Sequence, residues 1–370
     1  MHSAPAPRYH SRVTLLHERW FVDSSPFPLT WDGVTNPAAM AAAAIAAGIA
    51  AVAWFLSRRR TPEPVPGPLG LGANEQSLAV LYGSLPAMLA IHLAVPLVVS
   101  GINVELFAPN LILREPGTVP LQSPFAAAAS VLQIGIALAL FYGAFTRAAA
   151  LALVGLWAAG VVAFGPVLML EQAIVPGIAL ALAIMGRGPF AVDALLHVRR
   201  GLPRLRHLDQ AMTPLRIGTG VTLATLAFTE KLWNLPLGLA FLERYPVNFM
   251  PSLGVPMDDR TFLLAAGTIE LLAGLLLITN SYVRLGIVAL WLPFNLTLAA
   301  FGWRELVGHL PVYGAMAVLA IWGPGSQADV RALRRGLSQR PVLFEDVEPD
   351  TPEDVEPDTP EDGGRPPRPE

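Results

Sequence analysis

Nine long apolar runs constrain this chain more than any other feature of its sequence. They are 17 to 23 residues long and occupy residues 36–56, 78–100, 124–144, 148–164, 167–185, 214–232, 261–279, 283–301 and 305–322. A helix needs roughly 20 apolar residues to cross a bilayer core about 30 Å thick. The pattern therefore predicts an all-α polytopic membrane protein with about nine transmembrane helices.

The composition agrees with a chain whose surface faces lipid. Of the 370 residues, 53% are hydrophobic and only 14% are charged, and the mean hydropathy is +0.50. A soluble domain carries about 25% charged residues. Cysteine is absent, which excludes disulfides, thiolate metal sites and thiol redox chemistry. We expect a lipid bilayer as a partner and no nucleic acid.

The arginines orient the chain, because loops rich in Lys and Arg stay on the cytoplasmic side. One orientation places all the basic loops inside: Arg58–Arg60, Arg147, the group from Arg187 to Arg206, Arg284, and the group from Arg331 to Arg340. The N-terminus then lies outside and the C-terminus in the cytoplasm. We expect the protein in the bacterial plasma membrane.

The chain divides into seven segments. We expect an extracytoplasmic segment at 1–35, a first transmembrane helix at 36–60, a Pro/Gly-rich linker at 61–77, a four-helix unit at 78–200, a basic cytoplasmic linker at 201–213, a second four-helix unit at 214–335 and an acidic tail at 336–370. The aromatic side chains of segment 1–35 either dock on the bundle or a partner, or form an interfacial belt, which we favour. The tail contains EDVEPDTP twice in tandem and has too little apolar surface to offset ordering entropy, so we expect disorder.

The two four-helix units are related by an internal duplication. A shift of 137 residues places Gln133 on Glu270, Arg147 on Arg284 and Gly186 on Gly323. An even number of spans gives both copies the same orientation, so their pseudo-twofold axis is expected along the membrane normal. This arrangement weakens an inverted-repeat transporter and leaves a parallel-repeat carrier open.

The second copy is the more polar of the two, and we expect any catalytic or binding residues there. It has Glu270 where the first has Gln133, and Lys231 where the first has Glu105. Glu270 lies near the centre of its span, where an ionisable group is costly and seldom persists without a partner. It could relay a proton, or it could hold the bundle together by bonding across helices.

Three sequence stretches of the second copy resemble the DoxX family: TEKLW (229–233), GTIELLAGLLLITNSYVR (267–284) and WGPGSQADVRAL (322–333). The family consists of four-helix membrane proteins and includes the small subunit of thiosulfate:quinone oxidoreductase. The matching residues are Glu270, Gly274, Arg284, Gly323, Pro324, Gly325 and Asp329. The resemblance covers 214–333 well and 80–196 more loosely. It implies a subunit of a membrane redox complex linked to quinone.

Other polar residues of the second copy complete the candidate site. Glu230 and Lys231 could bind an anionic headgroup or a quinone carbonyl, or Lys231 could simply extend to the interface. Glu305 and His309 share a helix face at i, i+4 and could pass protons or form a structural hydrogen bond.

Two further residues have competing interpretations. Asn295 could face the same interior or belong to a kinked helix scaffold. Arg284 is a substrate-binding candidate, although helix capping and lipid contact also account for it.

Motifs for resident cofactors are absent from the sequence. There is no G-x-x-x-x-G-K-[ST] loop, C-x-x-C-H haem site or H-E-x-x-H metal motif. We expect no cofactor or metal site in the chain, although a polar cavity in the second copy could engage a quinone. Partner subunits would then hold the redox centre, and whether the chain is itself an enzyme stays open. The alternatives are a non-catalytic assembly subunit and a parallel-repeat carrier of a small molecule.

Overall fold

The regular structure of the chain is helical. The computed structural model describes residues 22, 24, 26–59, 75–113, 124–196, 204–301, 303–323 and 325, with the side chains of 75–79, 293, 297, 299–301 and 303–305 excepted. Within these residues there is no β-strand, and strand-like pairing is limited to an isolated bridge between Glu105 and Ile112. The predicted all-α class is therefore confirmed for the described part of the chain. The acidic tail lies outside it.

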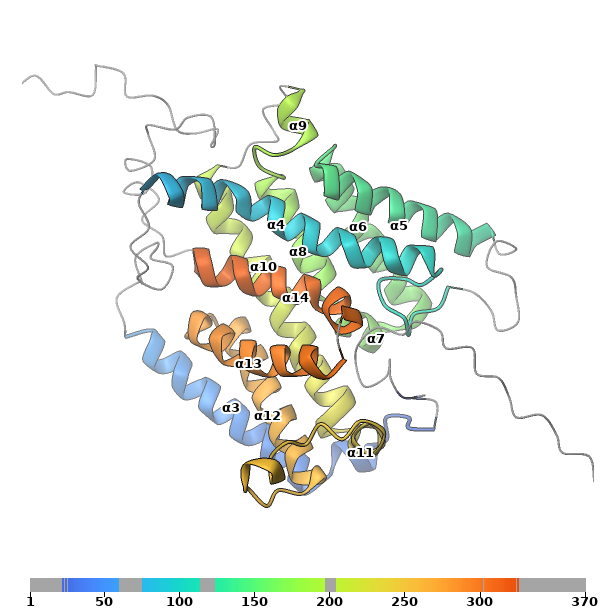
Figure 1. Cartoon of the computed structure of the whole chain (residues 1–370), viewed down its shortest axis with the longest axis vertical. Helices are drawn as coiled ribbons and strands as arrows, with labels where there is room; N and C mark the ends of the chain where they lie inside the picture. Colours follow the sequence, from blue (N-terminus) through green and yellow to red (C-terminus); the bar gives the residue numbers. More distant parts are fainter. Residues whose placement is uncertain are drawn as a thin grey trace, which may run out of the picture.

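Figure 1 shows how the helices are arranged. In chain order they are α2 (Trp31–Val34), α3 (Pro37–Ser57), α4 (Glu75–Ile102), α5 (Pro124–Tyr142), α6 (Thr146–Phe164), α7 (Pro166–Glu171), α8 (Ile174–Met185), α9 (Val192–Leu195), α10 (Leu205–Leu226), the π-helix η3 (Ala227–Leu232), α11 (Leu235–Arg244), the 3₁₀ turn η4 (Pro251–Leu253), α12 (Asp259–Ile278), α13 (Val283–Phe301) and α14 (Trp303–Trp322).

Five of these helices are long and apolar enough to cross a membrane. They are α3, α4 from Val80 onward, α5, α6 and α12. Helix α8 and two stretches, Val283–Leu296 of α13 and Leu306–Trp322 of α14, are apolar but shorter. Each of the five coincides with a predicted run, and nine spans remain a prediction.

Two predicted segments differ from the structure. The run at 167–185 is not one helix, because the chain turns at Gln172 and Ala173 between α7 and α8. The Thr222 hydroxyl of α10 accepts the Ile174 N–H at 2.8 Å and so caps the new helix.

Helix α10 begins at Leu205, within the segment expected as a basic linker at 201–213. Leu205, Leu208, Ala211, Met212 and Leu215 are buried at helical spacing. The polar residues between them lower the local hydropathy and hide the helix from a search for apolar runs.

Helix α10 runs through the middle of the molecule, between α8 and α12 (Figure 1). Glycines bring these helices into backbone contact. A Cβ atom on Gly218 would lie 2.7 Å from the Ala173 carbonyl oxygen and from Gly177 Cα. On the α12 side, a Cβ on Gly220 would lie 2.7 Å from the Gly274 carbonyl oxygen. Small residues at helix crossings permit such close approach in membrane proteins.

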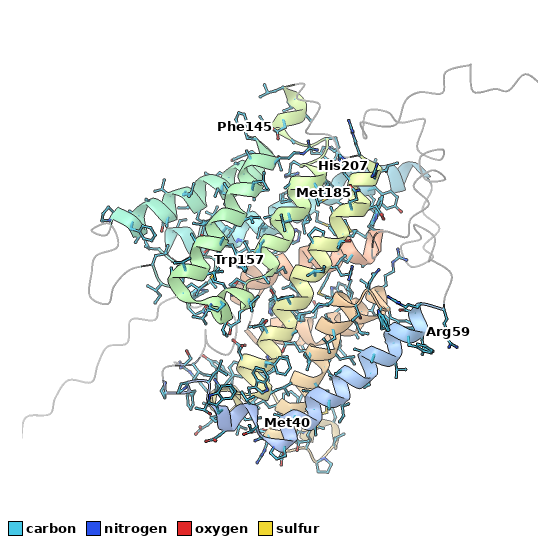
Figure 2. All side chains as sticks on the ribbon, turned by 180° about the vertical axis from the view of Figure 1, so that it is seen from behind. Met40, Arg59, Phe145, Trp157, Met185 and His207 are labelled. Atoms are coloured by element: carbon cyan, nitrogen blue, oxygen red, sulfur yellow. The ribbon has the colours of Figure 1, made fainter. Side chains whose placement is uncertain are left out.

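Helix α3 packs on α12 through a stripe of alanines. Ala39, Ala42, Ala46 and Ala50 recur every three or four residues and are buried, whereas the opposite face of the helix is exposed and apolar. At its C-terminal end, the Ser57 hydroxyl lies 3.4 Å from that of Ser281, which follows α12. Figure 2 shows the two ends of α3, marked by Met40 and Arg59.

Left-handed backbone recurs at the 137-residue shift found in the sequence. The matching pairs, with their φ angles, are Gly143 (70°) and Asn280 (59°), Phe145 (50°) and Tyr282 (47°), Gly186 (75°) and Gly323 (97°), and Gly188 (88°) and Gly325 (75°). Such angles are uncommon outside glycine. The bounds of α6 and α13 differ by the same shift.

Arginines cap equivalent helix ends in the two halves of the chain. Arg147 donates to the Ile184 carbonyl at 3.5 Å, and Arg284 donates to that of Ile321 at 3.4 Å. Two buried arginines cap two other helices. Arg187 donates to the Leu140 and Phe141 carbonyls at the end of α5, and Arg216 donates to those of Leu277 and Ile278 at the end of α12. Cations favour helix C-termini, where the last carbonyls are unpaired. Burial lowers the pKa of Arg187 to about 10, so this cap stays charged at neutral pH.

Candidate functional site

A π-helical segment, η3, extends α10 and carries two of the predicted site residues, Glu230 and Lys231. Its wider turn is seen in the bond from the Trp233 N–H to the Phe228 carbonyl, five residues earlier, at 2.9 Å. Single π turns within α-helices are frequent at functional sites. Lys231 faces α12, and Glu230 is buried with 1% of its surface exposed.

Lys231 and Glu270 form an ion pair between η3 and α12. The Lys231 Nζ lies 3.0 Å from the Glu270 Oε2, and their side chains are 19% and 17% exposed. Gly267, one turn before Glu270, makes the approach possible, because a Cβ there would lie 3.0 Å from the Lys231 Cβ and 2.9 Å from Leu232. A polar pair thus lies halfway along a membrane-length helix, with each partner partly accessible.

Apolar and aromatic residues lie near the two charged residues in the chain. The rings of Phe228 and Trp233 pack with centroids 4.2 Å apart and planes inclined by 30°. Leu232 and Leu271, the neighbours of the two charged residues, pack against the alanine stripe of α3. The arrangement combines one cationic donor, one carboxylate and an apolar wall.

Three of the predicted site residues therefore come together, and the others lie elsewhere. Arg284 lies at the start of α13, beyond the C-terminal end of α12, and donates to the Ala320 carbonyl near the end of α14. Asn295 is exposed on α13 and donates to the Trp291 carbonyl of its own helix at 2.7 Å, which favours the scaffold interpretation of this residue. The side chain of Glu305 lies outside the described residues.

His309 belongs to a separate aromatic cluster between α13 and α14. Its ring lies 4.5 Å from that of Phe294 and 6.2 Å from that of Tyr313. The Tyr313 hydroxyl donates to the Phe294 carbonyl at 3.1 Å and ties the two helices together. This position favours the structural interpretation of His309.

Gln133, which the 137-residue shift places on Glu270, has all its polar atoms hydrogen-bonded within the protein. Its Oε1 accepts the Phe107 N–H at 3.2 Å. Its Nε2 donates to the Leu97 carbonyl, the Ser100 hydroxyl and the Glu105 carbonyl, at 3.0, 2.9 and 3.2 Å. Gln133 is fully buried and holds the loop after α4 to the bundle. The two positions paired by the 137-residue shift thus differ: Gln133 is buried and fully hydrogen-bonded, and Glu270 belongs to a partly accessible ion pair.

Replacing Gln133 by leucine should lower the free energy of unfolding by about 2 kcal/mol or more, since each buried polar group left unpaired costs about 1–3 kcal/mol. Gln172→Leu is the matched control, because the Gln172 Nε2 is also buried but has no hydrogen-bond partner within the described part of the chain. Thermal denaturation in detergent measures both. Equal losses of stability in the two variants would mean that the Gln133 bonds contribute nothing.

Sequence reasoning missed two residues that shape the site. Gly267 gives η3 the room to approach α12, and Asn234, 2% exposed, follows η3 and bonds the N-terminal segment. Asn234 follows Lys231-Leu232-Trp233 at the end of an apolar run, and a polar residue in this place could have been recognised as a candidate. Gly267 was one glycine among many.

Comparisons with known proteins give no relative to set beside this geometry. A scan against protein-family models, a search of curated proteins and a search of solved structures each returned no match.

Proposed function

We propose that this chain is an integral membrane subunit of a quinone-linked redox complex, and that its second half holds a quinone headgroup at Lys231 and Glu270. The observation that carries the proposal is the ion pair itself. Charged side chains within a membrane are rare and mark functional sites by default. The sequence resemblance to the DoxX family favours the same class of function.

The proposed membrane architecture is one helix followed by two parallel four-helix units, with the arginine-rich ends in the cytoplasm. Support for the duplication comes from left-handed residues and helix bounds that recur at 137 residues. Support for the orientation comes from Arg58, Arg59, Arg147 and Arg284, which all lie at helix ends. The contact between Ser57 and Ser281 brings the end of α3 to the same level as the start of α13.

The residues at the ion pair fit a quinone. A quinone headgroup has carbonyl oxygens that accept hydrogen bonds, and a lysine ammonium supplies up to three donors. Phe228 and Trp233, whose rings pack on each other within three residues of Lys231, are aromatic side chains near the pair. When bound, the quinone would supply the redox chemistry, with its electrons exchanged with a partner subunit.

The roles of the two charged residues follow from their types. Lys231 would donate a hydrogen bond to a headgroup oxygen and fix the orientation of the ring. Glu270 would hold Lys231 in place and exchange a proton with it across the 3.0 Å contact. Proton exchange between positioned groups requires this hydrogen-bonding distance.

Binding of a short-chain benzoquinone to the purified protein, measured by equilibrium dialysis, tests the proposal. Lys231→Gln and Glu270→Gln should each weaken binding about tenfold or more, which corresponds to about 1.4 kcal/mol. Asn295→Ala is the control, because Asn295 is polar but exposed on another helix. Unchanged binding in both site variants, or no binding by the wild type, would contradict the proposal.

A non-catalytic assembly subunit is the second candidate function, favoured by the long exposed apolar face of α3. The two candidates predict different outcomes for Glu270→Gln in the intact complex. Normal assembly with lost turnover supports the quinone site, and normal assembly with normal turnover supports the assembly role.

A further inference from the structure

The segment before the first long helix is attached to the end of η3. We call residues 27–36 the strap. The Asn234 Nδ2 donates to the Phe27 carbonyl at 3.0 Å, and this asparagine is almost fully buried. Gly33 lies against the Trp233 carbonyl so closely that a Cβ on Gly33 would be 2.0 Å from its oxygen. Both contacts fall within three residues of Lys231.

The strap has its own local structure. The Thr30 hydroxyl accepts the Gly33 N–H at the start of the short helix α2. Asn36 then caps α3, accepting the N–H groups of Ala38 and Ala39, and Pro37 takes the first helical position. Since α3 packs on α12 through its alanines, the strap joins the two elements that carry Lys231 and Glu270.

The π-helical form of η3 needs support from outside its own sequence. The π-helix is rare because it gives up the tighter α-helical geometry. The residues AFTEKL include no proline or glycine that would force the wider turn. Contacts at the end of the segment, on Trp233 and Asn234, can hold it in this form. A return to α-helical winding would rotate Lys231 about the helix axis, away from Glu270.

We infer that the strap is a positioning element of the second-half site: through Trp233 and Asn234 it holds η3 in the form that pairs Lys231 with Glu270. The inference deepens the proposed function by naming what sets the geometry of that site. Gly33 and Asn234 are its positioning residues. The pairing itself can be measured without any quinone, so the two proposals fail separately.

The test measures the acylation of Lys231 by acetic anhydride, quantified by mass spectrometry of the peptide that carries it. Lys231 is the only lysine of the chain, so its peptide reports on this amine alone. Gly33→Ala should break the ion pair, because the new Cβ cannot fit against the Trp233 carbonyl. The acylation rate of Lys231 should then rise about tenfold, which corresponds to about 1.4 kcal/mol. Gly48→Ala, on α3 with nothing within 4 Å of the new Cβ, should leave the rate unchanged.

A double variant separates positioning from simple covering. Glu270→Gln alone should also raise the rate, and adding Gly33→Ala should raise it no further if the strap acts through the ion pair. If the rate increases caused by Glu270→Gln and Gly33→Ala multiply in the double variant, the inference is overturned. Equal acylation rates for Gly33→Ala and Gly48→Ala would also overturn it. If Gly33→Ala does not fold, Asn234→Leu and its conservative partner Asn234→Gln replace it. Raised acylation in the leucine variant and recovery in the glutamine variant support the strap, and equal rates overturn it.

Discussion

The Gly218→Ala protein should melt below the wild type, whereas Gly155→Ala should melt at or above it. Alanine is favoured over glycine in a helix by up to about 1 kcal/mol. A Cβ on Gly155 meets nothing within 4 Å, so this gain is retained. A Cβ on Gly218 meets two backbone atoms at 2.7 Å, the Ala173 oxygen and Gly177 Cα. Backbone cannot move aside as a side chain can, and overpacking costs about 1–3 kcal/mol or more.

Since both substitutions share the propensity gain, they are expected to differ by the overpacking cost, about 1–3 kcal/mol or more, with Gly218→Ala the less stable. Thermal denaturation of the detergent-solubilised proteins measures the difference. Gly274→Ala extends the test to the contact of α10 with α12, where its Cβ would lie 2.7 Å from the Gly220 oxygen. A Gly218→Ala protein as stable as Gly155→Ala would mean that α8 and α10 do not meet in backbone contact.

Much of the helical framework could be predicted from apolar runs alone. The runs at 124–144, 148–164 and 261–279 end within a few residues of α5, α6 and α12. The break between α7 and α8 could not be predicted, because the hydroxyl that caps α8 comes from Thr222, about 50 residues later. The start of α10 was missed for a different reason. Its buried face is apolar, but its polar face carries Arg206 and Asp209 and masks the signal.

The site could be predicted only in part. The sequence identifies polar side chains that are costly to place in an apolar helix, but not the direction in which they point. Glu230, Lys231 and Glu270 stand out as ionisable groups in apolar runs, and they do come together. Asn295 stands out by the same criterion and is exposed on α13. Pairing across helices depends on the π turn of η3 and on the space at Gly267. Neither has a local sequence signature.

Replacing Lys231 by methionine should destabilise the protein more than replacing Lys231 and Glu270 together. The single change leaves the Glu270 carboxylate without the ammonium that lies 3.0 Å from it. Removing one partner of a fully buried ion pair costs about 3–5 kcal/mol, and less where the pair is partly accessible as here, whereas exchanging both for apolar residues of similar volume is often neutral or stabilising. Glu270→Met should likewise be costly alone. The coupling energy from the four proteins is expected to be at least about 2 kcal/mol in favour of the pair.

Melting temperatures of the wild type, the two single variants and the double variant give this coupling, and benzoquinone binding is measured on the same four samples. If the loss of stability in the double variant equals the sum of the losses in the two single variants, Lys231 and Glu270 do not interact. A double variant that is stable but binds no quinone would separate the two roles of the pair. Stability would then not explain why two charges are kept in an apolar helix bundle, because methionines would fill the space as well. What the methionines cannot supply is a donor and a proton acceptor within 3.0 Å of each other, which is the property that a quinone site requires.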